Sequence, residues 1–117
     1  PLRVTQGMTN ALKTVTRDGG TAPKAHVPGY YVAGKTGTSQ KWINNAYSDR
    51  IHVASFVGYA PADNPEFVLM IVVDEPSYKY RYGGTAAAPT FRRIAEKTLR
   101  YLNVTPDLPD EITDEVK

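Results

Sequence analysis

Residues 30–40 read Tyr30-Tyr31-Val32-Ala33-Gly34-Lys35-Thr36-Gly37-Thr38-Ser39-Gln40. Aromatic, β-branched and hydroxyl-bearing side chains dominate this stretch, and such residues favour a β-strand. In its middle, a lysine is flanked by hydroxyl groups and a glycine. An ammonium group beside hydroxyl groups can neutralise and orient a carboxylate. The stretch therefore predicts a strand that binds an anionic group.

Alternate side chains of a strand point to opposite faces. We therefore expect Lys35 and Gly37 on one face, and Thr36 and Thr38 on the other. A glycine lets a second backbone or lobe approach closely, and an extended peptide could add along the strand edge. Taken alone, Lys35-Thr36-Gly37 also fits a strand at the sheet edge with a solvent-exposed lysine. The neighbouring sequence must therefore distinguish a binding strand from an ordinary surface strand.

A helix and a connector are predicted before this strand. Apolar residues recur at helical spacing, and Gly19-Gly20 supplies a stop, which predicts an amphipathic helix over residues 2–17. Residues 21–29 contain two prolines and a glycine and predict a connector. Within it, Thr21 and Lys24 have hydroxyl-to-lysine spacing, but the intervening Pro23 argues for a loop rather than a nucleophile.

Two more strands are predicted after it. Residues 42–50 are polar and turn-prone, and residues 51–59 alternate as a strand does. A turn over residues 61–65 would join that strand to residues 67–73 in a hairpin. Residues 67–73 are apolar on both faces, which predicts the centre of the sheet.

A last helix and an acidic tail are predicted at the end of the chain. Pro89 is expected in the first turn of the helix. Its apolar face would carry Phe91, Ala95, Thr98, Leu99 and Leu102. Residues 103–117 have the composition of an exposed, poorly ordered, flexible tail. The fold class is therefore α+β, with an antiparallel sheet of at least three strands covered by N- and C-terminal helices.

Composition excludes several classes of function. The 117 residues are 41% hydrophobic and 22% charged, typical of one globular domain or part of one. The lack of cysteine excludes disulfides and thiolate metal sites. No apolar run is long enough for a membrane span, and no signal peptide begins the chain, so we expect no membrane contact from this segment. The basic residues are dispersed apart from Arg92-Arg93, which argues against nucleic-acid binding.

A phosphate-loop pattern also covers Gly29 to Thr36, and the strand ending in Asp74-Glu75 imitates the magnesium-binding strand of such enzymes. A phosphate loop must open into a helix, yet Gly37 follows the lysine closely and no helical periodicity comes after it. A P-loop NTPase is therefore a remote alternative.

Other polar residues are interpreted as structural. His26 and His52 have no second ligand at useful spacing, and we expect solvated or structural roles. Asp74-Glu75 precedes Pro76 and predicts a turn at a strand end rather than a metal or acid/base pair. No cofactor and no metal site is expected.

Three tyrosines alternate with two cations just before Gly83-Gly84, namely Tyr78, Lys79, Tyr80, Arg81 and Tyr82. They fit an ordered stacking loop near a substrate groove and a plain surface hairpin equally well.

Several short sequence segments, here called blocks, lie before and after Lys35 and are informative together. They are Gly19-Gly20-Thr21-Ala22, residues 27–38, Ala54-Ser55-Phe56-Val57-Gly58-Tyr59-Ala60-Pro61, Val73-Asp74-Glu75-Pro76 and residues 83–91. Together with Lys35-Thr36-Gly37, the blocks resemble class B penicillin-binding proteins, the peptidoglycan D,D-transpeptidases of division and elongation. The resemblance covers about residues 5–102 and is closest to the division-specific, septal type, although an elongation member also fits.

This resemblance implies the transpeptidase fold shared by penicillin-binding proteins and serine β-lactamases, with residues 1–102 as a C-terminal segment of that domain. It implies that Lys35 acts in catalysis and that Lys35, Thr36, Gly37 and Thr38 bind the carboxylate of the substrate or drug. The backbone near Thr38 would help to form the oxyanion hole.

The family's nucleophile is the serine of S-x-x-K, and its second motif is S-x-N. None of the four serines, Ser39, Ser48, Ser55 and Ser77, has a lysine three positions later or an asparagine two positions later. We therefore expect the nucleophile on another segment of the same protein, and this chain alone is predicted to be inactive.

The implied partners are peptidoglycan stem peptides, β-lactams, the nucleophile-bearing part of the same protein and other division or elongation proteins. The implied location is the bacterial cell envelope, at the periplasmic or extracellular face of the cytoplasmic membrane, with the anchor outside this chain. The alternative is a non-catalytic peptide-binding or partner-docking module that retained the lysine strand.

Overall fold

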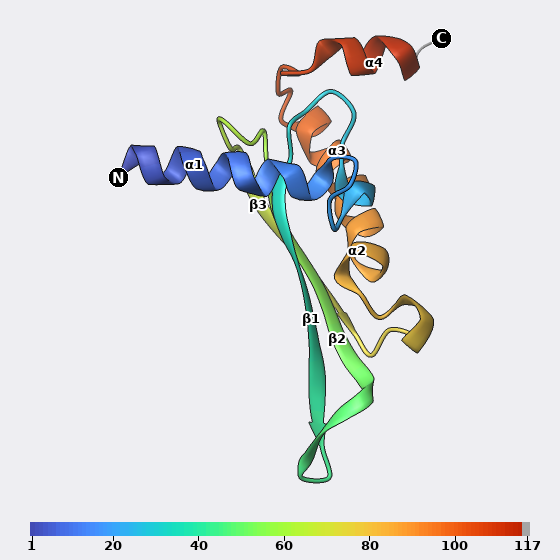
Figure 1. Ribbon diagram of the computed structural model, residues 1–117. Helices are drawn as coiled ribbons and strands as arrows, with labels where there is room; N and C mark the ends of the chain where they lie inside the picture. The colour runs from blue at the N-terminus through green and yellow to red at the C-terminus, as the bar shows by residue number, and fades with distance from the viewer. Residues whose placement is uncertain (116–117) are drawn as a thin grey trace.

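Three antiparallel strands form one sheet in the order β1-β2-β3. In this computed structural model residues 1–115 are described. The strands are β1 (Ala33–Ile43), β2 (Ala46–Ala60) and β3 (Phe67–Asp74), and the helices are α1 (Leu2–Lys13), α2 (Gly83–Ala86), α3 (Ala88–Tyr101) and α4 (Pro109–Glu115). Figure 1 shows α3 running beside the sheet, α1 crossing its upper end, and the β1–β2 hairpin extending beyond the helices. The predicted α+β class with an antiparallel sheet is confirmed.

The β1–β2 hairpin is longer than the sequence predicted. Residues 42–50 were expected to be a polar turn region, but all except Asn44 and Asn45 lie in the two strands. These two asparagines have positive φ angles of 52° and 65°. Asparagine tolerates this conformation, and a two-residue turn of this kind matches the twist of the strands it joins. The strand predicted from Tyr30 begins only at Ala33, because residues 28–30 form a turn.

The prediction that residues 67–73 form the centre of the sheet was wrong. In the three-stranded sheet that residues 1–115 form, β3 lies at an edge and β2 at the centre. The exposed side chains of β3 are Val68, Met70 and Val72, at 71%, 58% and 55% exposure. An apolar run predicts that both faces of a strand are covered in the complete fold, but it does not specify the position of the strand in the sheet.

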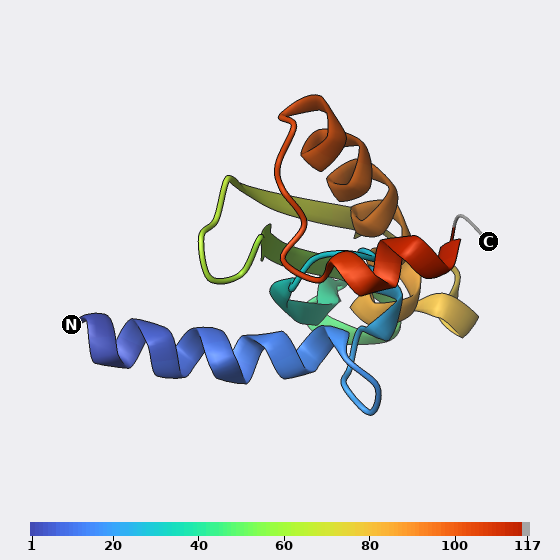
Figure 2. The same cartoon turned by 90° about the horizontal axis from the view of Figure 1, so that it is seen from above.

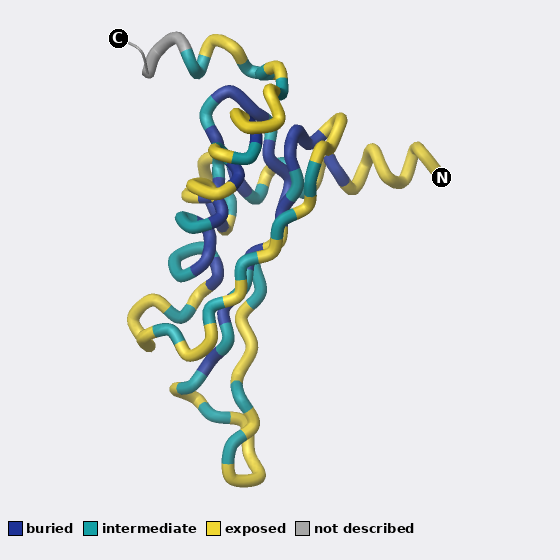
Figure 3. The backbone as a smooth tube through the Cα atoms, turned by 180° about the vertical axis from the view of Figure 1, so that it is seen from behind, coloured by how far each residue is buried: buried dark blue, intermediate teal, exposed yellow. Residues whose placement is uncertain are grey.

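The core lies between the sheet and α3. Phe56 of β2 and Phe91 of α3 are fully buried and pack edge to face, with ring centroids 4.7 Å apart. A Cβ atom at Gly58 would lie 2.8 Å from the ring of Phe91, and one at Gly34 would overlap the ring of Phe56. The two rings therefore occupy space that only glycine leaves free. Figure 3 shows buried residues concentrated in this part of the molecule.

The helix predicted over residues 2–17 is an α-helix to Lys13, followed by a short 3-10 turn over Thr14–Thr16. The buried hydroxyl of Thr16 donates to the carbonyl of Val32 at 2.8 Å, which ties the end of this segment to the start of β1. The outer end of α1 is exposed, including its apolar residues Leu2, Val4 and Met8. No helix within residues 1–115 is long and apolar enough to cross a membrane.

The tail was expected to be exposed and poorly ordered, but residues 103–115 include helix α4, which lies against the connector (Figure 2). The Glu111 carboxylate accepts hydrogen bonds from the Gly29 amide at 3.1 Å and Arg17 at 3.3 Å, and contacts His26 at 2.7 Å. The amide of Leu108 donates to the Gly29 carbonyl at 2.8 Å. Composition could not predict this docking. The docking depends on one carboxylate that contacts several donors from distant parts of the chain. Residues 116 and 117 lie outside the described part, and the domain boundary at residue 102 stays a prediction.

Burial tends to raise the pKa of the Glu111 carboxyl, but the hydrogen bonds from Gly29, His26 and Arg17 outweigh it. The net pKa therefore lies below the ordinary value of a glutamate. The carboxylate form is the one that the connector binds.

We expect replacement of Phe91 by alanine to cost about 3–5 kcal/mol of stability, because it leaves a cavity beside Phe56. Ile94→Ala on the exposed side of α3 is the matched control, since Ile94 is 41% exposed, and it should cost less than about 1 kcal/mol. Denaturant unfolding of the complete domain measures both. Equal losses for the two variants would contradict the assignment of the core.

We expect docking of the tail to depend on pH. A carboxyl whose pKa is lowered in the docked state stabilises docking above its unfolded pKa of about 4.3, and this contribution is lost as the pH falls through the docked value. Hydrogen exchange of residues 21–31, corrected for intrinsic rates, measures docking across this range. Glu111→Gln should show low protection that does not change with pH. Protection of the unaltered protein that persists unchanged to about pH 3 would contradict the role of the carboxylate.

Candidate functional site

The side chains of β1 alternate between the two faces of the sheet, as the sequence predicted. Thr36 and Thr38 lie opposite the core residues Phe56 and Ala54 of β2, on the face that α2 and α3 cover. Lys35 lies opposite Val57, on the open face. The two threonine hydroxyls therefore point toward the start of α2, whereas the lysine leaves the strand on the other side.

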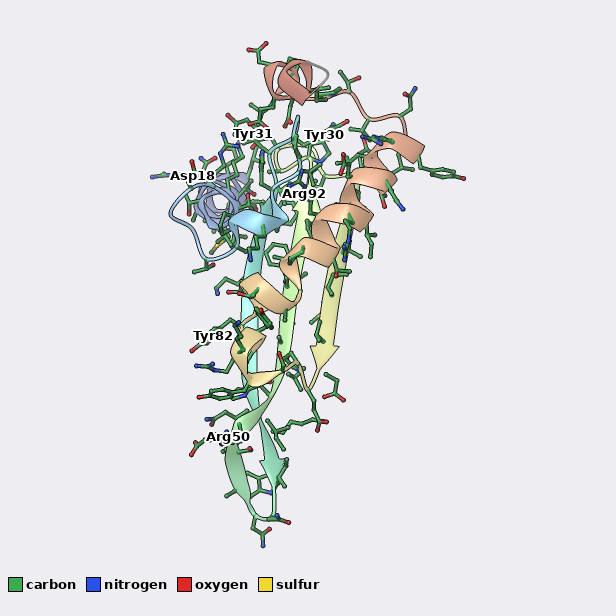
Figure 4. The ribbon with its side chains drawn as sticks, turned by 90° about the vertical axis from the view of Figure 1, so that its right-hand side faces the viewer. Asp18, Tyr30, Tyr31, Arg50, Tyr82 and Arg92 are labelled. Carbon is green, nitrogen blue, oxygen red and sulfur yellow. The ribbon has the colours of Figure 1, made fainter. Side chains whose placement is uncertain are left out.

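A hollow of about 350 Å³ lies beside these threonines. We call it the hydroxyl hollow, and its lining residues are Thr21, Thr36, Thr38, Tyr82, Gly83, Gly84 and Thr85. Figure 4 labels Tyr82 beside the start of α2 and Arg50 lower on the hairpin. Five of the seven lining residues carry hydroxyl groups, which can both donate and accept hydrogen bonds. The hollow is therefore suited to a small polar group.

Two glycines let α2 approach this closely. A Cβ atom at Gly83 would overlap the carbonyl oxygen of Ser55, and one at Gly84 would overlap the carbonyl oxygen of Thr21. The Gly83 amide donates to the Thr38 hydroxyl at 3.4 Å. The start of α2 is thus held between the sheet and the connector by contacts to main-chain atoms.

The Lys35 side chain bends back to its own strand. Its Nζ atom lies 3.0 Å from the carbonyl oxygen of Thr36 and 3.4 Å from the Thr36 hydroxyl. Among the side chains of residues 1–112 it has no carboxylate as an ion-pair partner. An exposed ammonium and a hydroxyl therefore meet at Thr36, and both can bind an anion.

Gly37 faces a side chain of the neighbouring strand, and its expected role toward a second lobe stays a prediction. The sequence suggested that it lets a second backbone or lobe approach. In the structure, a Cβ atom at Gly37 would meet the Ser55 hydroxyl on the neighbouring strand. Gly37 therefore makes room for Ser55 of β2, and the backbone that approaches is that of Gly83.

The other polar residues singled out from the sequence lie away from the hydroxyl hollow. β3 ends at Asp74, and Glu75 follows it with a φ of 55°, so the predicted strand-end turn is confirmed. Lys41 pairs with Asp74 at 2.8 Å and Glu75 at 3.1 Å, and these hydrogen bonds, that to Asp74 first, raise the pKa of Lys41.

The two histidines lie in separate places. His26 contacts Glu111 in the docked tail, a pairing that the sequence did not reveal. His52 is buried in β2, with its ring centroid 6.1 Å from that of Tyr78. No group of three potential metal-ligating side chains occurs in the described range.

The structure does not support the phosphate-loop alternative. Lys35 and Thr36 lie inside β1, which continues to Ile43, and no helix follows them. A phosphate loop requires helical amides directly after the lysine.

Sequence reasoning identified part of the site. It identified Thr36 and Thr38 but missed Thr21 and Thr85, which lie in segments interpreted only as a connector and a helix start. It left the place of Tyr82 open, and the structure puts this residue at the hollow. The paired glycines before Pro89 were the available signal, because two adjacent glycines often mark a close approach of backbones.

Comparison with known proteins agrees with this geometry. Residues 3–96 match the family described as penicillin binding protein transpeptidase domain. The chain belongs to this family. The resemblance to class B penicillin-binding proteins is thereby confirmed.

Named relatives support the assignment. The chain is 41% identical over 100 residues to the probable peptidoglycan D,D-transpeptidase PenA of Neisseria gonorrhoeae, covering 86% of this chain and 17% of that protein. It is 44% identical over 96 residues to stage V sporulation protein D of Bacillus subtilis, covering 82% and 15%. The chain therefore spans less than a fifth of the length of these penicillin-binding relatives.

Solved structures are similar too. The transpeptidase domain of penicillin-binding protein 3 from Burkholderia pseudomallei superposes with a TM-score of 0.77 at 44% identity, covering 86% of this chain and 30% of that one. Penicillin-binding protein 3 from Mycobacterium tuberculosis in complex with ampicillin gives a TM-score of 0.73 at 37% identity, covering 85% and 24%. The predicted transpeptidase fold is confirmed for this segment of the family's domain.

We expect Gly83→Ala to destabilise the domain by about 1–3 kcal/mol, because the added methyl group must push α2 away from the Ser55 carbonyl. Gly7→Ala in α1 is the control, since its methyl group would have no atom within 4 Å, and it should stabilise the helix by up to about 1 kcal/mol. Denaturant unfolding compares the two. A neutral Gly83→Ala variant would show that α2 is not held by this contact.

Proposed function

We propose that this chain supplies the substrate-binding strand of a serine-type peptidoglycan D,D-transpeptidase. In the complete protein, a serine on another segment cross-links stem peptides by acyl transfer and is acylated by β-lactams. The observation that carries the proposal is the meeting of the Lys35 ammonium and the Thr36 hydroxyl on an edge strand beside the hydroxyl hollow. Membership of the family supports it.

The proposed ligand of this strand is the terminal carboxylate of the stem peptide, or the carboxylate of a β-lactam. The Lys35 ammonium lies within reach of the Thr36 hydroxyl, so one carboxylate could contact both. Thr38 adds a second hydroxyl on the same face as Thr36. Because β1 is an edge strand, its outer main-chain groups can pair with an extended peptide.

The acyl transfer itself requires residues from elsewhere in the protein. The serine oxygen would attack the carbonyl carbon of the penultimate D-alanine, the bond to the terminal D-alanine would break, and an acyl-enzyme ester would form. An amine of a neighbouring stem peptide would then take the acyl group and release the serine. We propose that Lys35 acts by holding the carboxylate in register, and that the backbone near Thr38 polarises the carbonyl.

The open face of the sheet fits a covering part from the rest of the domain. Val57, Met70 and Val72 are exposed side by side on this face, at 37%, 58% and 55%. An apolar patch of this kind marks a surface that another part of a protein covers. We propose that the segment with the nucleophile packs here, which would place its serine on the same side as Lys35.

Penicillin-binding proteins act at the cell envelope, and we propose the outer face of the cytoplasmic membrane as the location of this one. The similarity to relatives named FtsI and stage V sporulation protein D supports a role in division-type wall synthesis. Other division proteins are therefore the proposed protein partners. Two observations support this function over a separate docking module: one face of the sheet is apolar and exposed, and this chain covers only 30% of the similar transpeptidase domain from Burkholderia pseudomallei.

We expect Lys35→Ala in the complete protein to slow acylation by a fluorescent penicillin by about one to two decades, since a charge-assisted contact contributes about 1.5–3 kcal/mol. Lys97→Ala on the exposed side of α3 is the control and should leave the rate unchanged. Stopped-flow fluorescence measures both rates. If the two variants react equally fast, Lys35 does not bind the carboxylate; if the unaltered protein never reacts, the docking-module alternative replaces the transpeptidase.

A further inference from the structure

The guanidinium of Arg81 lies between two tyrosine rings. Its central carbon is 4.0 Å from the ring centroid of Tyr78 and 4.5 Å from that of Tyr82. The same group donates to the Tyr78 carbonyl and to the Tyr82 hydroxyl, both at 2.9 Å. A flat guanidinium can lie over an aromatic ring while its separate N–H groups donate to two oxygens, a combination that a lysine ammonium reproduces poorly.

The two rings have different surroundings. Tyr78 contacts the sheet, with its centroid 6.1 Å from the buried ring of His52 and 5.7 Å from the guanidinium carbon of Arg50. Tyr82 directly precedes α2 and lines the hydroxyl hollow, although it is 55% exposed. An exposed tyrosine would otherwise rotate among its staggered conformers. Arg81 therefore connects Tyr78, which contacts His52 of β2, to Tyr82 at the hydroxyl hollow.

We infer that Arg81 is a positioning residue that holds the Tyr82 ring against the hydroxyl hollow, and so shapes the end of the site next to α2. The inference rests on the proposed function, because it concerns the same ligand-binding site. Arg81 itself does not line the hollow, so it acts through Tyr82. Lys79 offers a matched comparison, since it lies 5.3 Å from the ring of Tyr80, and neither residue lines the hollow.

The test compares Arg81→Ala, Lys79→Ala and Tyr82→Ala in the complete protein, together with the double variant of Arg81 and Tyr82. Reaction with a fluorescent penicillin is resolved into the dissociation constant of the first complex and the rate constant of acylation. We expect Arg81→Ala to weaken the first complex about two- to fivefold, with acylation changed less than about twofold, as loss of an exposed cation–π contact implies. Lys79→Ala should match the unaltered protein.

The double variant shows whether Arg81 changes the dissociation constant through Tyr82 or independently of it. If Arg81 acts through Tyr82, the Arg81→Ala change has no further effect once Tyr82 is alanine. An equal loss in both backgrounds, or none in either, overturns the inference while the proposed function stands. If the unaltered protein fails to react, both are overturned.

Arg81→Lys covers the case in which Arg81→Ala does not fold. It keeps the charge but not the planar group, and we expect it to weaken the first complex nearly as much as the alanine variant. Binding equal to that of the unaltered protein would show that charge alone suffices, and would overturn the stacking role.

Discussion

The close approach of α2 to the main chain of β1 and β2 is the contact on which the site depends. Gly83 and Gly84 lie between the sheet and the connector, where a methyl group would overlap carbonyl oxygens on either side. This contact places Tyr82 and Thr85 opposite Thr36 and Thr38, which creates the hydroxyl hollow. Hydroxyl groups from three separate segments thus converge because two residues lack side chains.

The core supports this arrangement by the same means. The rings of Phe56 and Phe91 fit over Gly34 and Gly58, so α3 can lie close to β2. Because α2 leads directly into α3, the depth at which Phe91 packs also determines how near Gly83 comes to the sheet. Core packing and site geometry are therefore coupled through the single residue, Ala87, between the two helices.

The sequence was sufficient for the class of fold, the strand with the lysine triplet and the two long helices, because these follow from periodicity and propensity. It was insufficient where geometry depends on distant partners. The apolar pattern of residues 67–73 is the same for a central and an edge strand, so the position of β3 could not be deduced. The docking of Glu111 on the connector, and the share of Thr21 in the hollow, arise from contacts between segments far apart in the chain.

The docked tail has a consequence for where the folded unit ends. The Gly29 amide lies in a buried residue and has the Glu111 carboxylate as its acceptor. Ending the polypeptide after α3 would remove this acceptor together with the Ile112 and Pro106 side chains that cover Gly29, so the amide would be left facing water. The connector that carries Thr21 to the hollow would lose its outer support, although the hydrogen bond concerned joins residues 82 positions apart. A chain that ends at residue 102 would keep every segment that resembles the family and would still loosen the edge of the hydroxyl hollow.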